Sequence, residues 1–317
     1  MIRSILITAI GGDISQGVAT ILRENRPDIK LVGVDMQNQH GGRMFVDEYA
    51  LVPPASNKNY KEEVRKLIKL YSIDAIIPMS EPELSAWLPF DDSANGVKWI
   101  TSGNKVVAFG LDKLETIKAI SNLGLPVPWT KKIQDGGIKK FPFIMKSRFG
   151  SGSRNVSIVQ NIMDFDYWAK KNPEGISQEL LEPADQEVTC AVYRDRTGKV
   201  ATLLMLRKLT GGLTGWAKVI YDPQALELCE KIAIGLDLKG SMNIQMRLTE
   251  CGPRVFEINP RFSSTVLMRH RVGFSDVLWA VSEAEGKPIH YPHIQGDIQM
   301  ARTQGAIILN KVSSAKK

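Results

Sequence analysis

The chain has 317 residues, and its 43% hydrophobic content is enough to build the cores of two or three compact units. Its net charge is +7, but the basic residues are spread along the chain with little aromatic interleaving, so we expect no nucleic-acid partner. No apolar run approaches the ~18 residues of a membrane span, and no signal-peptide pattern follows Met1. Together with three widely spaced cysteines, these features predict a cytoplasmic protein without a membrane partner.

The first hundred residues alternate between strand-like and helix-like segments. Strands are expected at 4–10, 30–36 and 74–80, and helices with apolar residues at helical spacing are expected at 15–25 and 60–72. Alternation of this kind predicts a parallel sheet with helices on its faces. We therefore assign residues 1–100 to an α/β, Rossmann-like domain.

The rest of the chain has an α+β pattern with mostly antiparallel strands. Helices are expected at 111–123 and near 223–235. Extended segments are expected at 141–147, 155–160, 176–182, 187–195, 199–208, 241–249 and 253–262. The first two of these flank a short glycine-rich loop and are predicted to form a hairpin. We divide this part into residues 101–182 and 183–317.

The last predicted strand contains the segment VFEINPRFSST and carries polar residues on one face. Residues two apart on a strand share a face, so Glu257 and Asn259 are expected to point the same way. By the same alternation, Phe256 and Ile258 are expected to point into a core. An acid and an amide beside apolar neighbours suggest that this strand binds something.

The preceding strand, MNIQMRL, has the same arrangement, and the two are expected to pair around a short turn. The simplest register sets Gln245 opposite Glu257 and Asn243 opposite Asn259. Oxygen donors that include a carboxylate suit Mg²⁺ carried with substrate phosphates, and Arg261 adds a planar fork for a phosphate or carboxylate oxygen. An ordinary solvent-facing hairpin is the alternative interpretation.

A second polar feature is the segment KSRFGSGSRN at 146–155. Its glycine and serine residues offer consecutive backbone amides directly after Lys146, which is the arrangement that cradles phosphates. Lys113 supplies another candidate phosphate charge. The Walker A pattern GxxxxGK[ST] does not occur, so any nucleotide site is of another kind.

Taken in order, the segments DKLETIKAISNLGLPVP, FPFIMKSRFGSGSRNV, QELLEPADQEVT, NIQMRL and VFEINPRFSST resemble the ATP-grasp superfamily, nearest to the carbamoyl-phosphate synthetase large chain type. The resemblance covers nearly the whole chain. It implies an N-terminal pre-ATP-grasp domain, a lid subdomain and a C-terminal ATP-grasp subdomain, with ATP between the last two. The chain lacks the duplicated halves of such a synthetase, which argues against that particular reaction.

Carried over to this sequence, the resemblance implies ATP contacts at Lys113, Lys146, Ser151, Gly152, Ser153, Glu179, Leu180, Leu181 and Glu187. It implies Mg²⁺ ligands, with Mn²⁺ as an alternative ion, at Gln245, Glu257 and Asn259. Catalytic arginines are implied at Arg261 and Arg207. The roles of Glu81, Glu83 and His270 stay open: the two acids are either contacts for a substrate amine or ordinary loop acids.

These features predict an ATP-dependent carboxylate–amine ligase that works through an acyl phosphate and releases ADP and phosphate. The substrates are then a small carboxylate and an amine, and a homodimer is compatible with such a chain. A dinucleotide-binding oxidoreductase is the alternative, because Gly11-Gly12 and Asp35 lie in a βαβ unit, although GGDISQG is not GxGxxG. A regulatory protein that binds ATP without turnover is the third reading.

Overall fold

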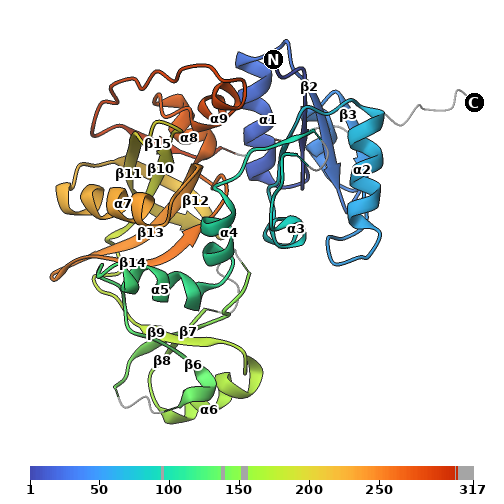
Figure 1. The fold of residues 1–317 in the computed structure, drawn as a ribbon. Coiled ribbons are helices and arrows are strands. Elements are labelled where there is room, and N and C mark those ends of the chain that lie inside the picture. Colours follow the sequence, from blue (N-terminus) through green and yellow to red (C-terminus); the bar gives the residue numbers. More distant parts are fainter. Residues whose placement is uncertain (94–95, 137–139, 151–155, 304, 306–317) are drawn as a thin grey trace, which may run out of the picture.

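The computed structural model of the protein (Figure 1) describes residues 1–93, 96–136, 140–150, 156–303 and 305. These residues form three sheets. A parallel sheet comes from the N-terminal third, a small sheet stands apart at one end, and a long antiparallel sheet comes from the C-terminal half. Within the described residues, no helix is both long and apolar enough to cross a membrane.

The N-terminal sheet has the order β3-β2-β1-β4-β5, and every pair in it is parallel, as the βα alternation predicts. Its strands are β1 (Ser4–Ile7), β2 (Lys30–Asp35), β3 (Glu48–Leu51), β4 (Ala75–Ile77) and β5 (Lys98–Trp99). The connecting helices are α1 (Asp13–Asn25), η1 (Gly41–Phe45), α2 (Tyr60–Leu70) and α3 (Glu81–Trp87). All four residues of β1 are buried, because helices cover both faces of the sheet.

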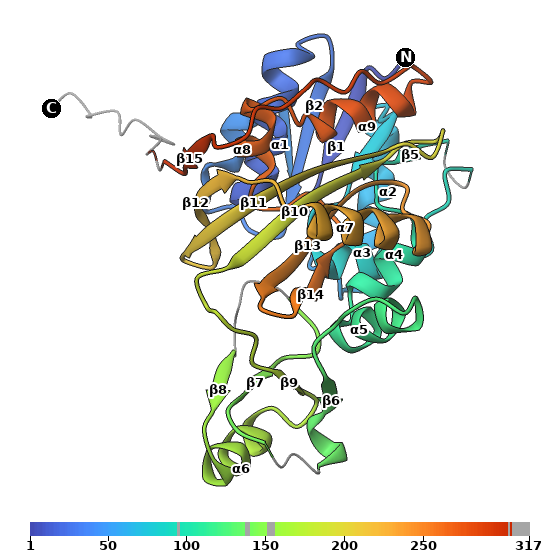
Figure 2. The same cartoon turned by 90° about the vertical axis from the view of Figure 1, so that its left-hand side faces the viewer.

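Two helices lead to the small sheet, which stands apart from the rest of the molecule (Figures 1 and 2). They are α4 (Asn104–Gly110) and α5 (Lys113–Asn122). The small sheet has the order β6-β9-β7-β8 and consists of β6 (Thr130–Lys132), β7 (Phe143–Lys146), β8 (Ser157–Val159) and β9 (Ile176–Glu179), together with η2 (Ile133–Asp135) and α6 (Ile162–Lys171). Strands β7 and β8 pair antiparallel, which confirms the predicted hairpin. We call residues 130–179 the lid.

The C-terminal sheet is antiparallel, with the order β14-β13-β10-β11-β12-β15. Its strands are β10 (Glu187–Arg194), β11 (Val200–Thr210), β12 (Leu213–Val219), β13 (Gly240–Thr249), β14 (Gly252–Asn259) and β15 (Gln299–Ala301). The remaining helices are α7 (Pro223–Gly235), α8 (Val266–Arg271) and α9 (Asp276–Ala284). Strands β12 and β15 were not expected from the sequence.

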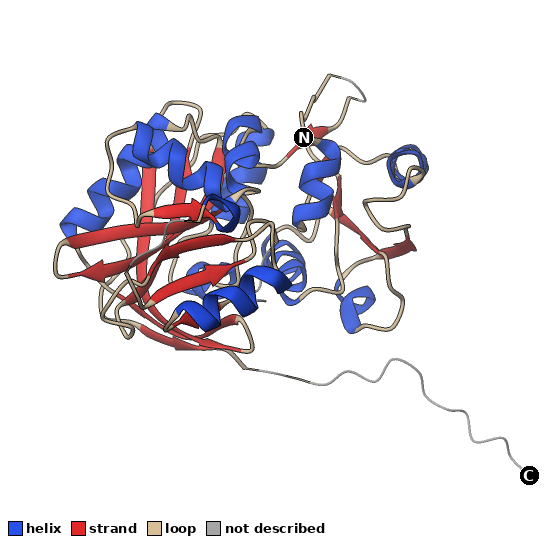
Figure 3. Cartoon of the chain, turned by 90° about the horizontal axis from the view of Figure 1, so that it is seen from below, coloured by secondary structure: helices blue, strands red, loops and turns tan. Residues whose placement is uncertain are grey.

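Each face of this sheet packs against a different layer, as Figure 3 shows from below. One face packs against α7 through residues such as Cys190, Ile244 and Val255. The other face carries Tyr193 and Met205, which share one continuous core with the N-terminal domain. This second face becomes polar toward the lid, and the change from apolar to polar side chains defines the candidate site.

The hairpin of β13 and β14 has the register that the sequence predicts, with Asn243 opposite Asn259 and Gln245 opposite Glu257. The ladder shifts just beyond Gln245, because Phe256 is an extra residue in β14 and forms a bulge. The expectation that Phe256 points into the core is therefore wrong, and it is only half-buried. Ile258 is buried in the core as expected.

Candidate active site

The polar end of the C-terminal sheet gathers side chains from four neighbouring strands. They are Glu187 and Thr189 of β10, Arg207 of β11, Asn243 and Gln245 of β13, and Glu257 and Asn259 of β14. Strand alternation explains this grouping, because Glu187 and Thr189 share a face of β10 with the buried Tyr193. The same face of the sheet thus packs into the hydrophobic core at one end and carries the candidate active site at the other.

Glu187 and Arg207 form the centre of a buried ionic cluster. The Arg207 guanidinium donates to Glu187 Oε1 through Nε at 3.0 Å and Nη2 at 2.8 Å, and Nη2 also donates to Gln245 Oε1 at 2.8 Å. Arg247 Nη2 donates to the second carboxylate oxygen of Glu187 at 3.2 Å. Glu187 Oε1 thus accepts two hydrogen bonds, and Oε2 accepts one and keeps acceptor capacity for another. The predicted ATP contact at Glu187 and the predicted catalytic role of Arg207 stay predictions.

The two predicted ATP lysines lie on opposite sides of Glu257. Lys113, the first residue of α5, has its ammonium 3.9 Å from Glu257 Oε1. Lys146, the last residue of β7, donates to the carbonyl oxygen of Phe256 at 3.3 Å. The pKa of Lys146 is lowered to about 8, chiefly by burial and also by the positive charge of Lys113, while the negative charges of Glu257 and Glu187 partly oppose that change. Both lysines thus lie near Glu257, and their contacts with ATP stay predictions.

An ion pair that the sequence analysis did not identify connects the lid to α5. Asp112 caps the N-terminus of α5, and its carboxylate accepts three hydrogen bonds from Arg148 at 2.6–3.0 Å. The backbone amide of Lys113 donates to the Arg148 carbonyl at 3.1 Å, and the Lys113 ammonium contacts the Gly150 carbonyl. These bonds hold Lys113 against the lid. Asp112, at the start of the predicted helix 111–123, is a typical N-cap residue, and this was the sign in the sequence that could have pointed to the cap.

Arg261 lies in the loop after β14, and its Nη1 donates to the Phe262 carbonyl at 3.0 Å. Its Nε is buried without a hydrogen-bond partner among the described residues, which leaves a donor for a ligand. Burial lowers the pKa of Arg261, while Glu81 and Glu257 favour its charged form. The loop is anchored to the linker, because Ser102 Oγ donates to the Pro260 carbonyl at 2.9 Å.

The structure separates the two acids whose roles the sequence left open. Glu83 is buried and accepts hydrogen bonds from Thr8 at 2.6 Å, Tyr60 at 3.1 Å and Ser80 at 2.6 Å. It forms a capping box with Ser80 at the start of α3, and burial raises its pKa. Glu83 is thus structural. Glu81 lies close enough to Arg261 for its negative charge to favour the charged form of the guanidinium.

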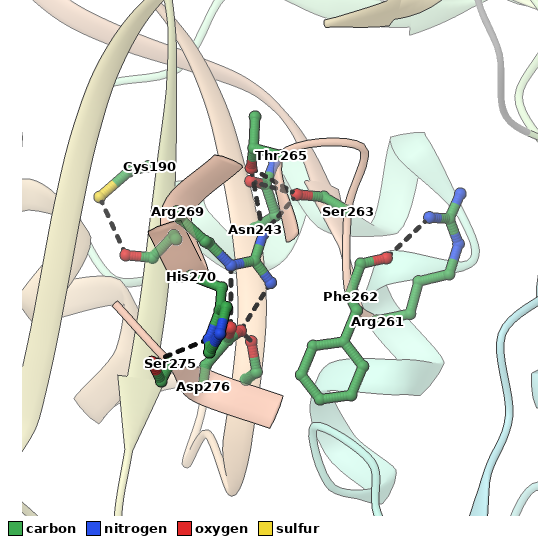
Figure 4. A network of polar contacts seen from close by, with 12 residues as sticks. Cys190, Asn243, Arg261, Phe262, Ser263, Thr265, Arg269, His270, Ser275 and Asp276 are labelled. Atoms are coloured by element: carbon green, nitrogen blue, oxygen red, sulfur yellow. Dashed lines mark hydrogen bonds and ion pairs between the residues drawn. The ribbon is translucent and has the colours of Figure 1, made fainter. Parts of the chain in front are cut away.

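His270 lies on α8, and Figure 4 shows its ring beside Ser275 rather than beside Arg261. Ser275 Oγ lies 3.0 Å from His270 Nδ1, and Asn25 Nδ2 lies 3.3 Å from Nε2. Burial lowers the pKa of this half-buried imidazole. These contacts give His270 a structural role between α1 and α9.

Three of the remaining predicted ATP contacts lie at the end of the lid and in its connection to β10. Glu179 ends β9, and its carboxylate accepts a hydrogen bond from the Trp129 amide at 3.2 Å. Leu180 is partly buried and Leu181 is buried, both in the connection to β10. The other three predicted contacts, Ser151, Gly152 and Ser153, lie outside the described residues.

The predicted metal ligands match a cation that arrives with phosphates. Within the described residues, no three His, Cys, Asp or Glu side chains gather closely enough to hold a metal ion. Glu257 offers one carboxylate, and Gln245 and Asn259 offer amide oxygens on the same sheet face. Asn259 Nδ2 is buried without a hydrogen-bond partner among those residues, so this amide is available to a ligand. One carboxylate plus neutral oxygens suits Mg²⁺ whose other ligands are phosphate oxygens and water.

Two family models match the chain. Residues 5–99 match the PylC-like, N-terminal domain, and residues 173–306 match ATP-grasp in the biosynthetic pathway with Ter operon. The carbamoyl phosphate synthase large chain of Thermoplasma acidophilum is 26% identical over 259 residues, which are 72% of this chain and 25% of that protein. The chain thus spans about a quarter of the length of this curated relative.

Solved structures share the fold over most of the chain. An ADP complex of N5-carboxyaminoimidazole ribonucleotide synthetase has a TM-score of 0.76 at 15% identity, covering 95% of this chain and 81% of that one. The biotin carboxylase domain of Hydrogenobacter thermophilus 2-oxoglutarate carboxylase, in complex with MgADP, ADP and bicarbonate, has a TM-score of 0.73 at 17% identity, covering 94% and 73%. The predicted fold and family resemblance are confirmed, because residues 173–306 match an ATP-grasp family model, residues 5–99 match a PylC-like N-terminal domain, and the solved structures share the fold.

Proposed function

We propose that this protein is an ATP-dependent carboxylate–amine ligase that forms a carbon–nitrogen bond through an acyl phosphate. The observation that carries the proposal is the arrangement of Lys113, Lys146 and Arg261 around the single carboxylate of Glu257. Three positively charged side chains near one carboxylate can bind the negative charges of a polyphosphate, and the carboxylate can bind its metal ion. The ADP complexes of the structural neighbours support the same use of the fold.

In this proposal the protein works by positioning and by charge neutralisation. Lys146 binds the phosphates from the lid side, and Lys113 binds them from the start of α5. Arg261 offers its unpaired Nε–H to the oxygens of the transferred phosphoryl group and of the carboxylate that receives it. Glu257, Gln245 and Asn259 would hold Mg²⁺, or Mn²⁺ in its place, which neutralises phosphate charge when bound.

The amine is proposed to enter from the N-terminal domain. Glu81 begins α3 and acts electrostatically on Arg261 across the boundary between the two domains. A carboxylate beside the site of acyl phosphate formation attracts an ammonium group and can accept its proton as the amine attacks. ADP and phosphate leave after the amide bond forms. The carboxylate and the amine are both small molecules in this proposal.

We also propose the divisions at residues 100 and 182, because each of the three parts contributes its own sheet. A homodimer is proposed as the assembly. Because the chain spans a quarter of the carbamoyl phosphate synthase large chain, the reaction of that relative is not assigned to it. The similarity to that large chain supports only the phosphoryl-transfer chemistry of a single ATP-grasp unit.

The oxidoreductase alternative fits the N-terminal turn poorly. Asp35, at the end of β2, accepts a hydrogen bond from the Gly11 amide at 2.8 Å. The ring of His40 lies so close to Gly11 that a Cβ there would be 2.7 Å from it. The imidazole thus occupies the space in front of the glycine turn where a dinucleotide pyrophosphate would sit. The third hypothesis is a regulatory protein that binds ATP without turnover. The chain keeps all the proposed lysines and metal ligands, so a measurement of ATP turnover distinguishes this hypothesis from the ligase.

Incubation of the protein with MgATP, hydroxylamine and a library of carboxylates tests the proposal. An acyl phosphate is electrophilic, so hydroxamate and ADP should appear in equal amounts, and Arg261→Ala should lose both. ADP release without hydroxamate for any carboxylate would remove the acyl phosphate mechanism. A protein that binds MgATP and consumes none with any carboxylate and amine would support the regulatory alternative.

A further inference from the structure

A buried chain of polar side chains runs from α9 to the candidate site (Figure 4). Arg269 is fully buried on α8, and its Nε and Nη2 donate to Asp276 at 2.9 and 2.6 Å. Its remaining nitrogen, Nη1, donates to Ser263 Oγ at 2.8 Å and to Thr265 Oγ1 at 3.1 Å. Ser263 Oγ in turn donates to Asn243 Oδ1 at 3.0 Å. The chain therefore ends on an amide at the site.

The direction of these hydrogen bonds follows from the arginine. A guanidinium donates and never accepts, so Ser263 accepts from Arg269 and is free to donate its own hydrogen to Asn243. Thr189 Oγ1 donates to the same amide oxygen at 2.9 Å. Asn243 Oδ1 therefore has two donors. Asn243 Nδ2 is buried without a hydrogen-bond partner among the described residues.

The charge of Arg269 favours this orientation of the amide. Asp276 contacts Nε and Nη2, so the positive charge on Nη1 faces Ser263 without a carboxylate beside it. The negative end of the Asn243 amide dipole is stabilised on that side, and a reversed amide would direct its positive end toward Arg269. The buried ion pair therefore determines which atoms of Asn243 are offered to a ligand.

The place of Asn243 in the ladder indicates which ligand it meets. It lies two residue pairs along the ladder from the Gln245–Glu257 pair and directly opposite Asn259, at the end of β14 that leads to Arg261. Asn259 Nδ2 also has no partner there among the described residues. Two neighbouring amides with unused N–H groups require acceptors, which a bound ligand or a water molecule supplies.

We propose that Asn243 determines specificity by donating its amide N–H groups to an oxygen of the carboxylate substrate, and that Arg269 and Ser263 are positioning residues that keep this donor turned toward the substrate. The inference rests on the proposed ligase function, because it identifies Asn243 as a contact for the carboxylate in that reaction. It excludes Asn243 Oδ1 as a metal ligand, because that oxygen accepts from Ser263 and Thr189.

Asn243→Asp is the discriminating variant, because it replaces the NH₂ group by an oxygen of nearly the same size. The probe is ¹³C-acetate, measured by saturation-transfer NMR in the presence of MgADP. Repulsion between two oxygens should weaken acetate binding by about 10-fold or more, while the MgADP affinity from calorimetry changes little. If Asn243 instead faced a metal ion with its oxygen, aspartate would leave acetate binding intact and strengthen Mg²⁺ binding, and the inference would be overturned.

Ser263→Ala tests the positioning part without removing the buried ion pair. Losing the hydroxyl removes one of the two donors to Asn243 Oδ1 and leaves only Thr189 to orient the amide, so acetate binding should weaken. Ser263→Thr keeps a hydroxyl and should bind acetate as the parent does. Arg269→Met is the more severe variant and is examined by circular dichroism before binding is measured. Acetate affinity unchanged in Ser263→Ala, or absent in a wild-type protein that binds MgADP, would refute the inference. A wild-type protein that does not bind MgADP would refute the proposed function itself.

Discussion

Replacing Lys146 by methionine should stabilise the folded protein and weaken its hold on nucleotide phosphates. Lys146 is only 6% exposed, and its pKa falls from 10.5 to about 8, chiefly because burial penalises the ammonium. This difference corresponds to about 3 kcal/mol at neutral pH. Methionine removes the penalty but also loses the hydrogen bond to the Phe256 carbonyl, worth about 1 kcal/mol. We expect the free energy of unfolding at pH 7 to rise by roughly 2 kcal/mol.

The contribution of Lys146 to the free energy of unfolding changes with pH in one direction. The folded pKa lies below the unfolded one, so the wild-type protein releases this proton on folding between pH 8 and pH 10.5 and becomes more stable across that range. The advantage of the methionine variant should therefore be largest below pH 8 and should disappear near pH 10.5. Urea unfolding at a series of pH values measures this difference.

The same variant reports on function. A charge-assisted hydrogen bond to phosphate contributes about 1.5–3 kcal/mol, so the MgADP affinity should fall by roughly 10- to 100-fold in calorimetry at pH 7. Lys118→Met is the control, because its ammonium pairs with Glu115 on the exposed face of α5 and should affect neither measurement. A drop in stability at pH 7 would refute the burial argument, and an unchanged MgADP affinity would remove Lys146 from the phosphate site.

Two further substitutions test the metal site and the anchoring of its loop. Glu257→Gln keeps the side-chain shape and removes the charge, so hydroxamate formation should require more Mg²⁺ and fall steeply, and a parent-like magnesium titration would contradict the ligand assignment. Gly110→Ala should cost about 1–3 kcal/mol in thermal unfolding, because the new Cβ would lie 2.8 Å from the Pro260 ring and displace Arg261. Gly296→Ala, which has open space around it, is the matched control.

Local patterns were sufficient to predict much of the fold. Helical spacing and buried apolar runs located α1, α2 and the strands between them, because each element buries one face against its neighbours. The register of β13 and β14 was predictable because a short turn leaves few ways to pair two strands whose polar faces must coincide. Site residues on those strands were therefore accessible from sequence alone.

Contacts between distant segments were not accessible in this way. Asp112 and Arg148 are 36 residues apart, and nothing local to either shows that they pair. Arg269 lies in the basic stretch MRHR, and its full burial depends on Asp276 at the start of α9. Glu83 was ambiguous for the same reason, since Thr8 lies 75 residues before it. Charged residues are assigned to surfaces by default, and only tertiary structure identifies the exceptions.

The bulge at Phe256 connects the core of the C-terminal sheet to the chemistry of its site. Val255 is buried in the core, whereas Glu257, two residues later, faces the site. A regular strand would put both on one face, so the chain needs one extra residue between them. Phe256 is that residue, and the hydrogen bond its carbonyl accepts from Lys146 gives the ammonium a polar partner beside Glu257. The sequence holds a sign of this change of face, because the buried residues Val255 and Ile258 are three apart and a regular strand would put them on opposite faces. The extra residue that breaks the regular strand alternation is thus what lets β14 supply both core residues and Glu257 of the candidate site.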